Sequence, residues 1–121
     1  MKLKVIEHEF CVCQVKSIEE IDFRDEFVFV SKTDEELSLV CAKEALSKNP
    51  LQCDEGWRAI RIEEKLDFSL IGILAKISDI LAKNKIGIFV VSTYNTDIIL
   101  VKKEQLLEAV VALKQAGYQF L

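Results

Sequence analysis

The feature that most constrains the fold of this chain is a segment that occurs twice. Residues 28–40 read VFVSKTDEELSLV and residues 89–101 read FVVSTYNTDIILV, which places the two copies 61 positions apart. In each copy an apolar strand pattern ends in a serine, and a polar stretch leads to a second strand pattern that begins at an acid, Glu36 or Asp97. Such a repeat predicts two related half-domains in one chain. Because the polar stretch interrupts aliphatic strands, we expect functional residues there.

The composition predicts an ordinary globular protein. The chain has 121 residues, of which 50% are hydrophobic and 30% are charged, and this balance and length suffice for a packed core. The formal net charge of −4 argues against nucleic acid as a partner, since nucleic acid normally requires a basic face. We see no signal peptide, and no stretch approaches the roughly 20 apolar residues of a membrane span. We therefore expect a cytoplasmic protein with no membrane partner.

The four cysteines indicate neither a metal site nor a disulfide framework. They are Cys11, Cys13, Cys41 and Cys53, with no CxxC pair and no histidine near enough in sequence to complete a zinc site. Cys11 and Cys13 are two residues apart on an expected strand, so both should point to one face as buried thiols. We expect no metal and no cofactor.

Periodicity in the second half predicts the order β-α-β-β-α-β. Apolar residues at helical spacing predict helices over 70–83 and 104–116. We expect Asp67 or Ser69 to cap the first helix and Asn84 to end it in a left-handed conformation. The strand patterns are 57–63, 86–92, 97–102 and 118–120, and Thr93–Thr96 connects the middle two as a hairpin. This order is typical of the ferredoxin-like α+β fold, an antiparallel sheet with both helices on one face.

The first half is a shortened version of the second. Its strand patterns are 10–16, 27–31 and 36–41. The intervening Ser17–Glu26 is too short for a crossover helix, and a helical remnant is expected at Lys43–Lys48. Residues 49–56 contain the only proline and are the expected boundary. We therefore expect a degenerate half over 1–54 and a complete domain over 55–121.

These motifs resemble an ACT domain, a small regulatory module that binds amino acids. The residues that carry the resemblance are WRA from Trp57, LDFSLIG at 66–72 and STYNTDIILV at 92–101. The segment TDEELSLV at 33–40 is similar to the degenerate first copy of two-ACT proteins such as the animal cytosolic arginine sensors. The resemblance implies a ferredoxin-like ACT fold, and an effector bound at a helix start that packs against a neighbouring ACT unit.

Elementary chemistry independently favours a binding site there. Backbone N–H groups at Ser69–Gly72 would lie unpaired in the first helical turn, where the helix dipole attracts a carboxylate. Gly72 would allow a ligand to approach the backbone closely, and Asp97 could accept hydrogen bonds from an α-amino group. The candidate ligand-binding residues are Asp67, Phe68, Ser69, Leu70, Ile71, Gly72, Ser92, Thr93, Asn95, Thr96, Asp97, Glu36 and Ser38.

Structural roles remain open for several of these residues. Thr93–Thr96 can be only a hairpin turn, Gly72 can serve only helix–sheet packing, and Ser69 can be only a helix cap. Glu36 can be exposed to solvent, or it can face a site between units.

The sequence disfavours an enzyme and an RNA-binding module. The only histidine, His8, has no nucleophile or acid at a fixed spacing, and no phosphate-binding loop is present. The strands that would stack RNA bases carry IRI at 60–62 and IILV at 98–101 instead of aromatics. We expect a non-catalytic, homodimeric sensor of an amino acid effector. The alternative is a structural or protein-interaction module that has the fold but no effector.

Overall fold

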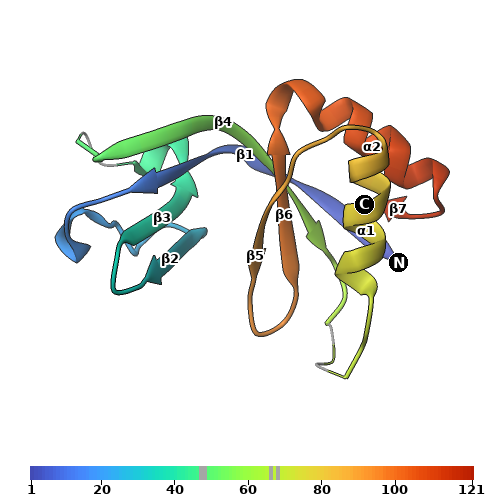
Figure 1. Cartoon of the computed structure of the whole chain (residues 1–121), viewed down its shortest axis with the longest axis horizontal. Coiled ribbons are helices and arrows are strands. Elements are labelled where there is room, and N and C mark those ends of the chain that lie inside the picture. Colours follow the sequence, from blue (N-terminus) through green and yellow to red (C-terminus); the bar gives the residue numbers. More distant parts are fainter. Residues whose placement is uncertain (47–48, 66, 68) are drawn as a thin grey trace. The chain divides into compact units, whose positions relative to one another are not determined.

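The computed structural model describes residues 1–46, 49–65, 67 and 69–121 (Figure 1). The strands are β1 (Lys2–Gln14), β2 (Val28–Lys32), β3 (Leu37–Ala42), β4 (Gln52–Ile62), β5 (Phe89–Ser92), β6 (Asp97–Lys102) and β7 (Gln119–Phe120). The helices are α1 (Ile73–Lys83) and α2 (Leu106–Gln115), and short 3-10 turns cover Ile18–Glu20, Lys43–Ala45 and Lys103–Gln105. Among the described residues, no helix is long and apolar enough to cross a membrane.

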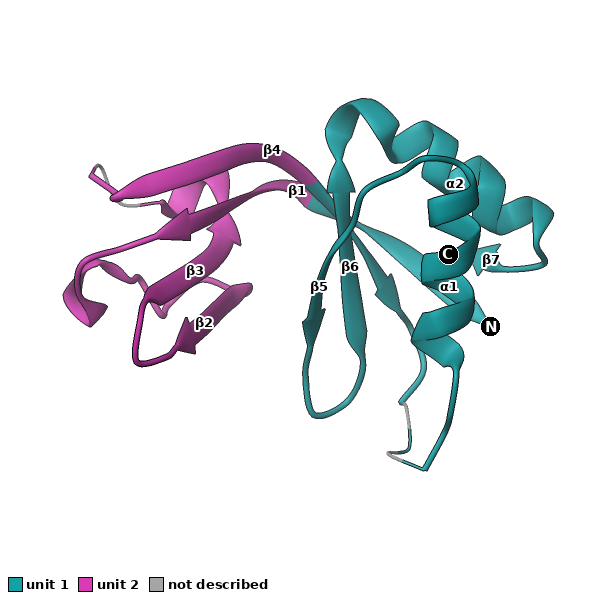
Figure 2. Cartoon of the chain, viewed as in Figure 1, with its two compact units in different colours: residues 1–7, 58–121 teal, residues 8–57 magenta. Residues whose placement is uncertain are grey.

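The chain forms two compact units (Figure 2). Residues 1–7 and 58–121 make one, here called the αβ unit, and residues 8–57 make the other, here called the β unit. Strands β1 and β4 contribute residues to both. The units therefore do not follow the chain as two consecutive halves, and the relation between halves 1–54 and 55–121 stays a prediction.

The αβ unit has the predicted β-α-β-β-α-β order from β4 to β7. Its strands are ordered β7-β1-β4-β6-β5, and both helices lie on the same side of them (Figure 1). One prediction was wrong, because the sheet is not purely antiparallel: β1 lies between β7 and β4 and pairs with β7 in parallel, Lys2 opposite Gln119. The early part of β1 was missed, since its charged residues hide the buried Leu3 and Ile6.

The core of the αβ unit lies between its strands and its two helices. Its buried members are Leu3, Ile60, Ile62, Ile77, Leu81, Ile86, Ile99, Val101, Ala109 and Leu113. Leu74 is partly buried and packs against this cluster, so Leu74 and Ile77 share a helix face as predicted. Burial of one such aliphatic side chain contributes roughly 1.5–3 kcal/mol. The core therefore fixes the start of α1 relative to the β5–β6 hairpin.

The start of α1 differs from the prediction. The helix begins at Ile73, three residues later than expected, because Gly72 at the N-cap position adopts a left-handed φ of 82°. The predicted capping by Asp67 or Ser69 is also wrong. Asp67 Oδ1 instead accepts the backbone N–H of Ser69 at 2.8 Å, which forms a turn before the helix.

The other helix ends agree with the prediction only in part. Asn84 is not left-handed, since its φ is −94°, and the following Lys85 takes that conformation with a φ of 59°. The α-helix α2 covers less than the predicted 104–116, because a 3-10 turn precedes it. Gly117 follows its C-cap with a φ of 101°, which is the predicted left-handed terminator.

The β unit contains β2, β3 and parts of β1 and β4, in the order β2-β3-β1-β4. Where a remnant helix was predicted over Lys43–Lys48, only the 3-10 turn Lys43–Ala45 is found, and residues 47–48 lie outside the described residues. The expected boundary at 49–56 is not a linker, because β4 begins at Gln52 and continues through Gly56.

The repeated segment forms two hairpins of the same design. The N–H of Thr33 donates to Glu36 O at 2.9 Å, and the N–H of Thr93 donates to Thr96 O at 2.8 Å. In both turns the first threonine Oγ1 also accepts the N–H three residues later, at 3.2 Å and 3.3 Å. After each hairpin the chain enters a 3-10 turn that begins at a lysine.

This geometry corrects the register of the repeat. Thr33 corresponds to Thr93, an offset of 60 positions, whereas the sequence match used 61. The counterpart of Asp97 is therefore Leu37, and Glu36 corresponds to Thr96. The acid is not repeated, so the structure gives no support to Glu36 as a second copy of Asp97.

Candidate functional site

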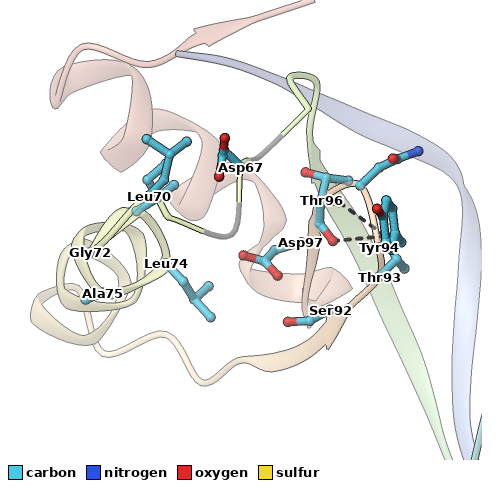
Figure 3. A pocket seen from close by; sticks show the side chains of 12 residues that line it. Asp67, Leu70, Gly72, Leu74, Ala75, Ser92, Thr93, Tyr94, Thr96 and Asp97 are labelled. Carbon is cyan, nitrogen blue, oxygen red and sulfur yellow. Dashed lines mark hydrogen bonds between the residues drawn. The ribbon is translucent and has the colours of Figure 1, made fainter.

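A cleft of about 360 Å³ lies between the start of α1 and the β5–β6 hairpin, within the αβ unit (Figure 3). This volume falls in the range of small-molecule sites, roughly 300–1,000 Å³. The lining residues are Asp67, Leu70, Gly72, Ile73, Leu74, Ala75, Ser92, Thr93, Tyr94, Asn95, Thr96 and Asp97. The LDFSLIG and STYNTD motifs thus meet at one cleft.

Four of the predicted site residues that the structure describes are not in this lining. Ser69 and Ile71 lie in the segment before α1 but do not line the cleft, and Ile71 is 95% exposed. Phe68 lies outside the described residues. Glu36 and Ser38 belong to the β unit, where the Ser38 hydroxyl donates to Glu36 Oε1 at 2.6 Å.

The helix end of the cleft is formed by residues whose backbone N–H groups have no acceptor within the helix. Helix α1 has 11 residues, and its first intrahelical bond runs from the N–H of Lys76 to Gly72 O at 3.0 Å. The N–H groups of Ile73, Leu74 and Ala75 therefore have no acceptor within the helix, and all three residues line the cleft. These groups replace the predicted Ser69–Gly72, because the helix starts later than its apolar pattern suggested. They form the positive end of the helix dipole.

The hairpin side of the cleft is held by two threonine hydroxyls. Thr93 Oγ1 donates to Thr96 O at 3.0 Å, within the turn. Thr96 Oγ1 donates to Ile62 O at 2.8 Å, and this bond ties the turn to the end of β4. Both hydroxyl protons are thus used inside the protein. These bonds give both side chains a structural role in the turn, and their role in ligand binding stays a prediction.

Asp97 and Ser92 present polar groups toward the helix. The two residues are opposite each other on β6 and β5, so their side chains share one face. Figure 3 shows the Asp97 carboxylate and the Ser92 hydroxyl on the side of the hairpin that faces α1. Asp97 is half-buried and Ser92 is exposed. The cleft therefore has hydrogen-bond donors on one wall and a carboxylate on the other.

The charged side chains among the described lining residues are all acidic. Hydrogen bonds from the backbone N–H and the hydroxyl of Ser69 hold the pKa of Asp67 below its usual value, so this carboxylate is ionised at neutral pH. Among the lining residues the structure describes, Asp67 and Asp97 are the charged ones, and none is a lysine or arginine. A positive helix end and two carboxylates suit a ligand that carries both charges.

Sequence reasoning missed four lining residues. Ile73, Leu74 and Ala75 were assigned to the helix, and their side-chain pattern signals only the core. Tyr94 was treated as part of a polar turn, although it is 82% exposed and lines the cleft. The signal that could have identified Tyr94 was a large aromatic residue at the tip of a short hairpin.

Within the described part of the chain, no group of three or more His, Cys, Asp or Glu side chains is arranged to hold a metal ion.

Comparisons with known proteins identify the family. The ACT domain family model matches residues 52–115, which is more than half of the chain. A search of curated proteins found no match. Among solved structures, protein Atu0741 from Agobacterium tumefaciens is 31% identical, with 99% of this chain and 91% of that chain covered and a TM-score of 0.86.

Two more distant structures share the fold. VC0802 from Vibrio cholerae, described as a protein of unknown function and possible transport protein, is 20% identical over 94% of this chain and 88% of its own, with a TM-score of 0.73. The ligand-free regulatory subunit of aspartate kinase from Thermus thermophilus is 10% identical over 95% and 96%, with a TM-score of 0.65.

The fold and the cleft define an α+β protein of the ferredoxin-like class, which confirms the predicted fold class. The chain belongs to the ACT domain family. The resemblance stated from the sequence motifs is thereby confirmed.

Proposed function

We propose that this chain is a non-catalytic regulatory protein that binds a free amino acid in the cleft. One observation carries the proposal: Asp97 and the residues Ile73–Ala75, whose backbone N–H groups have no acceptor within α1, line one cleft. An α-carboxylate would accept hydrogen bonds from the helix start, and an α-ammonium would donate to Asp97. Leu70 and Leu74 would contact the aliphatic part of the ligand.

The family and the chemistry of the cleft support a regulatory role. One structure of similar fold is a regulatory subunit of an amino acid kinase. Among the described lining residues there is no histidine or lysine to activate Ser92 as a nucleophile. Ligand binding would act by shifting a conformational or oligomeric equilibrium toward the state that binds more tightly.

We also propose that the protein is a homodimer. The β unit contains no α-helix among its described residues, and its large apolar side chains Ile18, Phe23 and Leu51 are each at least 50% exposed. Two-fold pairing is the commonest way for identical chains to bury such surface.

A thermal-melting screen against the twenty amino acids tests the proposed ligand. At a hundred times its dissociation constant, the true ligand should stabilise the fold by about 2.7 kcal/mol, which raises the melting temperature by several degrees. Common nucleotides serve as the comparison set. If no amino acid shifts the melting temperature, the alternative of a structural module without an effector is favoured.

A further inference from the structure

The four cysteines gather on three adjacent strands of the β unit. Cys11 and Cys13 lie on β1, Cys41 on β3 and Cys53 on β4, and β1 lies between β3 and β4. Cys11 is directly opposite Cys41. The Cys53 side chain lies close enough to Cys11 and Cys13 to interact electrostatically with both thiols. The proposed amino acid site uses none of these thiols.

The thiols differ sharply in access to solvent. Cys11, Cys13 and Cys41 are buried, whereas Cys53 is exposed. Burial, and next the neighbouring Cys53, raises the pKa of Cys11 to about 12. Burial, and next the hydrogen bond with Cys53, also raises the pKa of Cys13. The β1 thiols are therefore protonated at neutral pH and shielded, so Cys53 is the thiol that a dissolved oxidant reaches first.

We propose that Cys53 is an oxidative modification site and that one of the β1 thiols, Cys11 or Cys13, resolves it as an intramolecular disulfide. The oxidant is a peroxide. The Cys53 thiolate attacks a peroxide oxygen, which breaks the O–O bond and leaves Cys53 sulfenic acid and hydroxide. The β1 sulfur then attacks the Cys53 sulfur, and its proton leaves with the displaced hydroxide as water. Two thiols are oxidised and one peroxide is reduced to two waters.

Strands β1 and β4 are adjacent, and the usual spacing of neighbouring strands suits such a bond. Adjacent strands lie about 4.7–4.9 Å apart, and disulfides join residues whose Cα atoms are about 4.4–6.8 Å apart. Cys53 interacts with both β1 thiols in the reduced protein. Raised pKa values reduce the thiolate fraction of the resolving cysteine, so disulfide formation should accelerate as the pH rises.

Peptide mapping of the full-length protein tests the proposal. After hydrogen peroxide treatment and alkylation, we expect one disulfide-linked peptide pair that joins Cys53 to Cys11 or Cys13. In a sample measured before alkylation, the intact mass should fall by about 2 Da, the two hydrogens lost, and dithiothreitol should reverse the change. Only intermolecular disulfides, only irreversible oxidation of Cys53, or no oxidation of Cys53 would overturn the proposal.

Three variants identify the roles of the thiols. Cys53→Ser should abolish the disulfide, and Cys41→Ala, the matched buried control, should retain it. The double variant Cys11→Ala/Cys13→Ala should lack the disulfide and accumulate a sulfenic acid at Cys53 that dimedone traps. Loss of the disulfide in Cys41→Ala with a native circular dichroism spectrum would contradict the proposed pairing. The wild-type peptide map decides the question if a variant does not fold.

Discussion

At the scale of single residues, a substitution of Asp97 distinguishes a binding site from a hairpin turn with no ligand. In the proposed complex Asp97 accepts a charge-assisted hydrogen bond from the ligand ammonium, worth roughly 1.5–3 kcal/mol. Asp97→Ala should therefore weaken amino acid binding by about ten- to a hundred-fold, measured by titration calorimetry. Asp67→Ala should change affinity less, because Asp67 is engaged with the backbone of Ser69. Unchanged ligand-induced stabilisation in Asp97→Ala would refute the site assignment.

A second prediction at the scale of single residues concerns the effect of Gly72 on the free energy of unfolding. Its φ of 82° suits glycine, and an added Cβ would meet nothing within 4 Å. The cost of Gly72→Ala is therefore backbone strain alone, about 1–2 kcal/mol, seen as a lower urea midpoint. Gly87 is the matched control, since an added Cβ there also meets nothing and its φ lies outside the left-handed region. Equal effects of the two substitutions would argue against the strained start of α1.

At the scale of elements, the hairpin depends on its bond to β4. Thr96→Val keeps the shape of the side chain and removes the donor to Ile62 O. We expect a loss of about 1–3 kcal/mol in unfolding free energy, because a carbonyl loses its partner. Thr96→Ser should restore most of it. Chemical denaturation measures both variants, and a Thr96→Val protein as stable as the wild type would show that the bond is unimportant.

The elements also show what sequence periodicity can establish. The β5–β6 hairpin and both helices were predicted because their apolar residues alternate or recur at helical spacing over several turns. The start of α1 was misplaced because Leu70 extends the helical stripe, yet it is 52% exposed and precedes the helix. The repeat was aligned on Ser31 and Ser92, whereas backbone pairing equates Lys32 with Ser92. Pattern alone does not distinguish two alignments one residue apart.

The candidate site could be predicted only in part, because some of its groups belong to side chains and others to the backbone. The residue types indicated Asp97, Ser92 and Gly72 as site residues, and all three line the cleft. The helix contributes backbone N–H groups, which leave no signature in residue type. Their location depends on where the helix begins, and the left-handed conformation of Gly72 determines that.

At the scale of the whole molecule, the homodimer is the first prediction. Sedimentation velocity at micromolar concentration should show a species of twice the chain mass, which is 13.8 kDa. Phe23→Asp, at an apolar residue that is 58% exposed in the single chain, should shift the equilibrium toward the monomer if the β unit forms the interface. A single 13.8 kDa species for the wild-type protein would refute the dimer.

The path of β1 has a further consequence at this scale. Residues 8–57 are an insertion between residues 7 and 58 of the αβ unit, and the segment matched by the family model starts after β1. An excised 52–115 fragment would lack the strand between β7 and β4, together with the fully buried Leu3. Deletion of residues 1–7 should therefore abolish the cooperative unfolding transition of the αβ unit in calorimetry. The αβ unit, which contains the proposed site, is discontinuous in sequence, and its boundaries cannot be drawn as one interval.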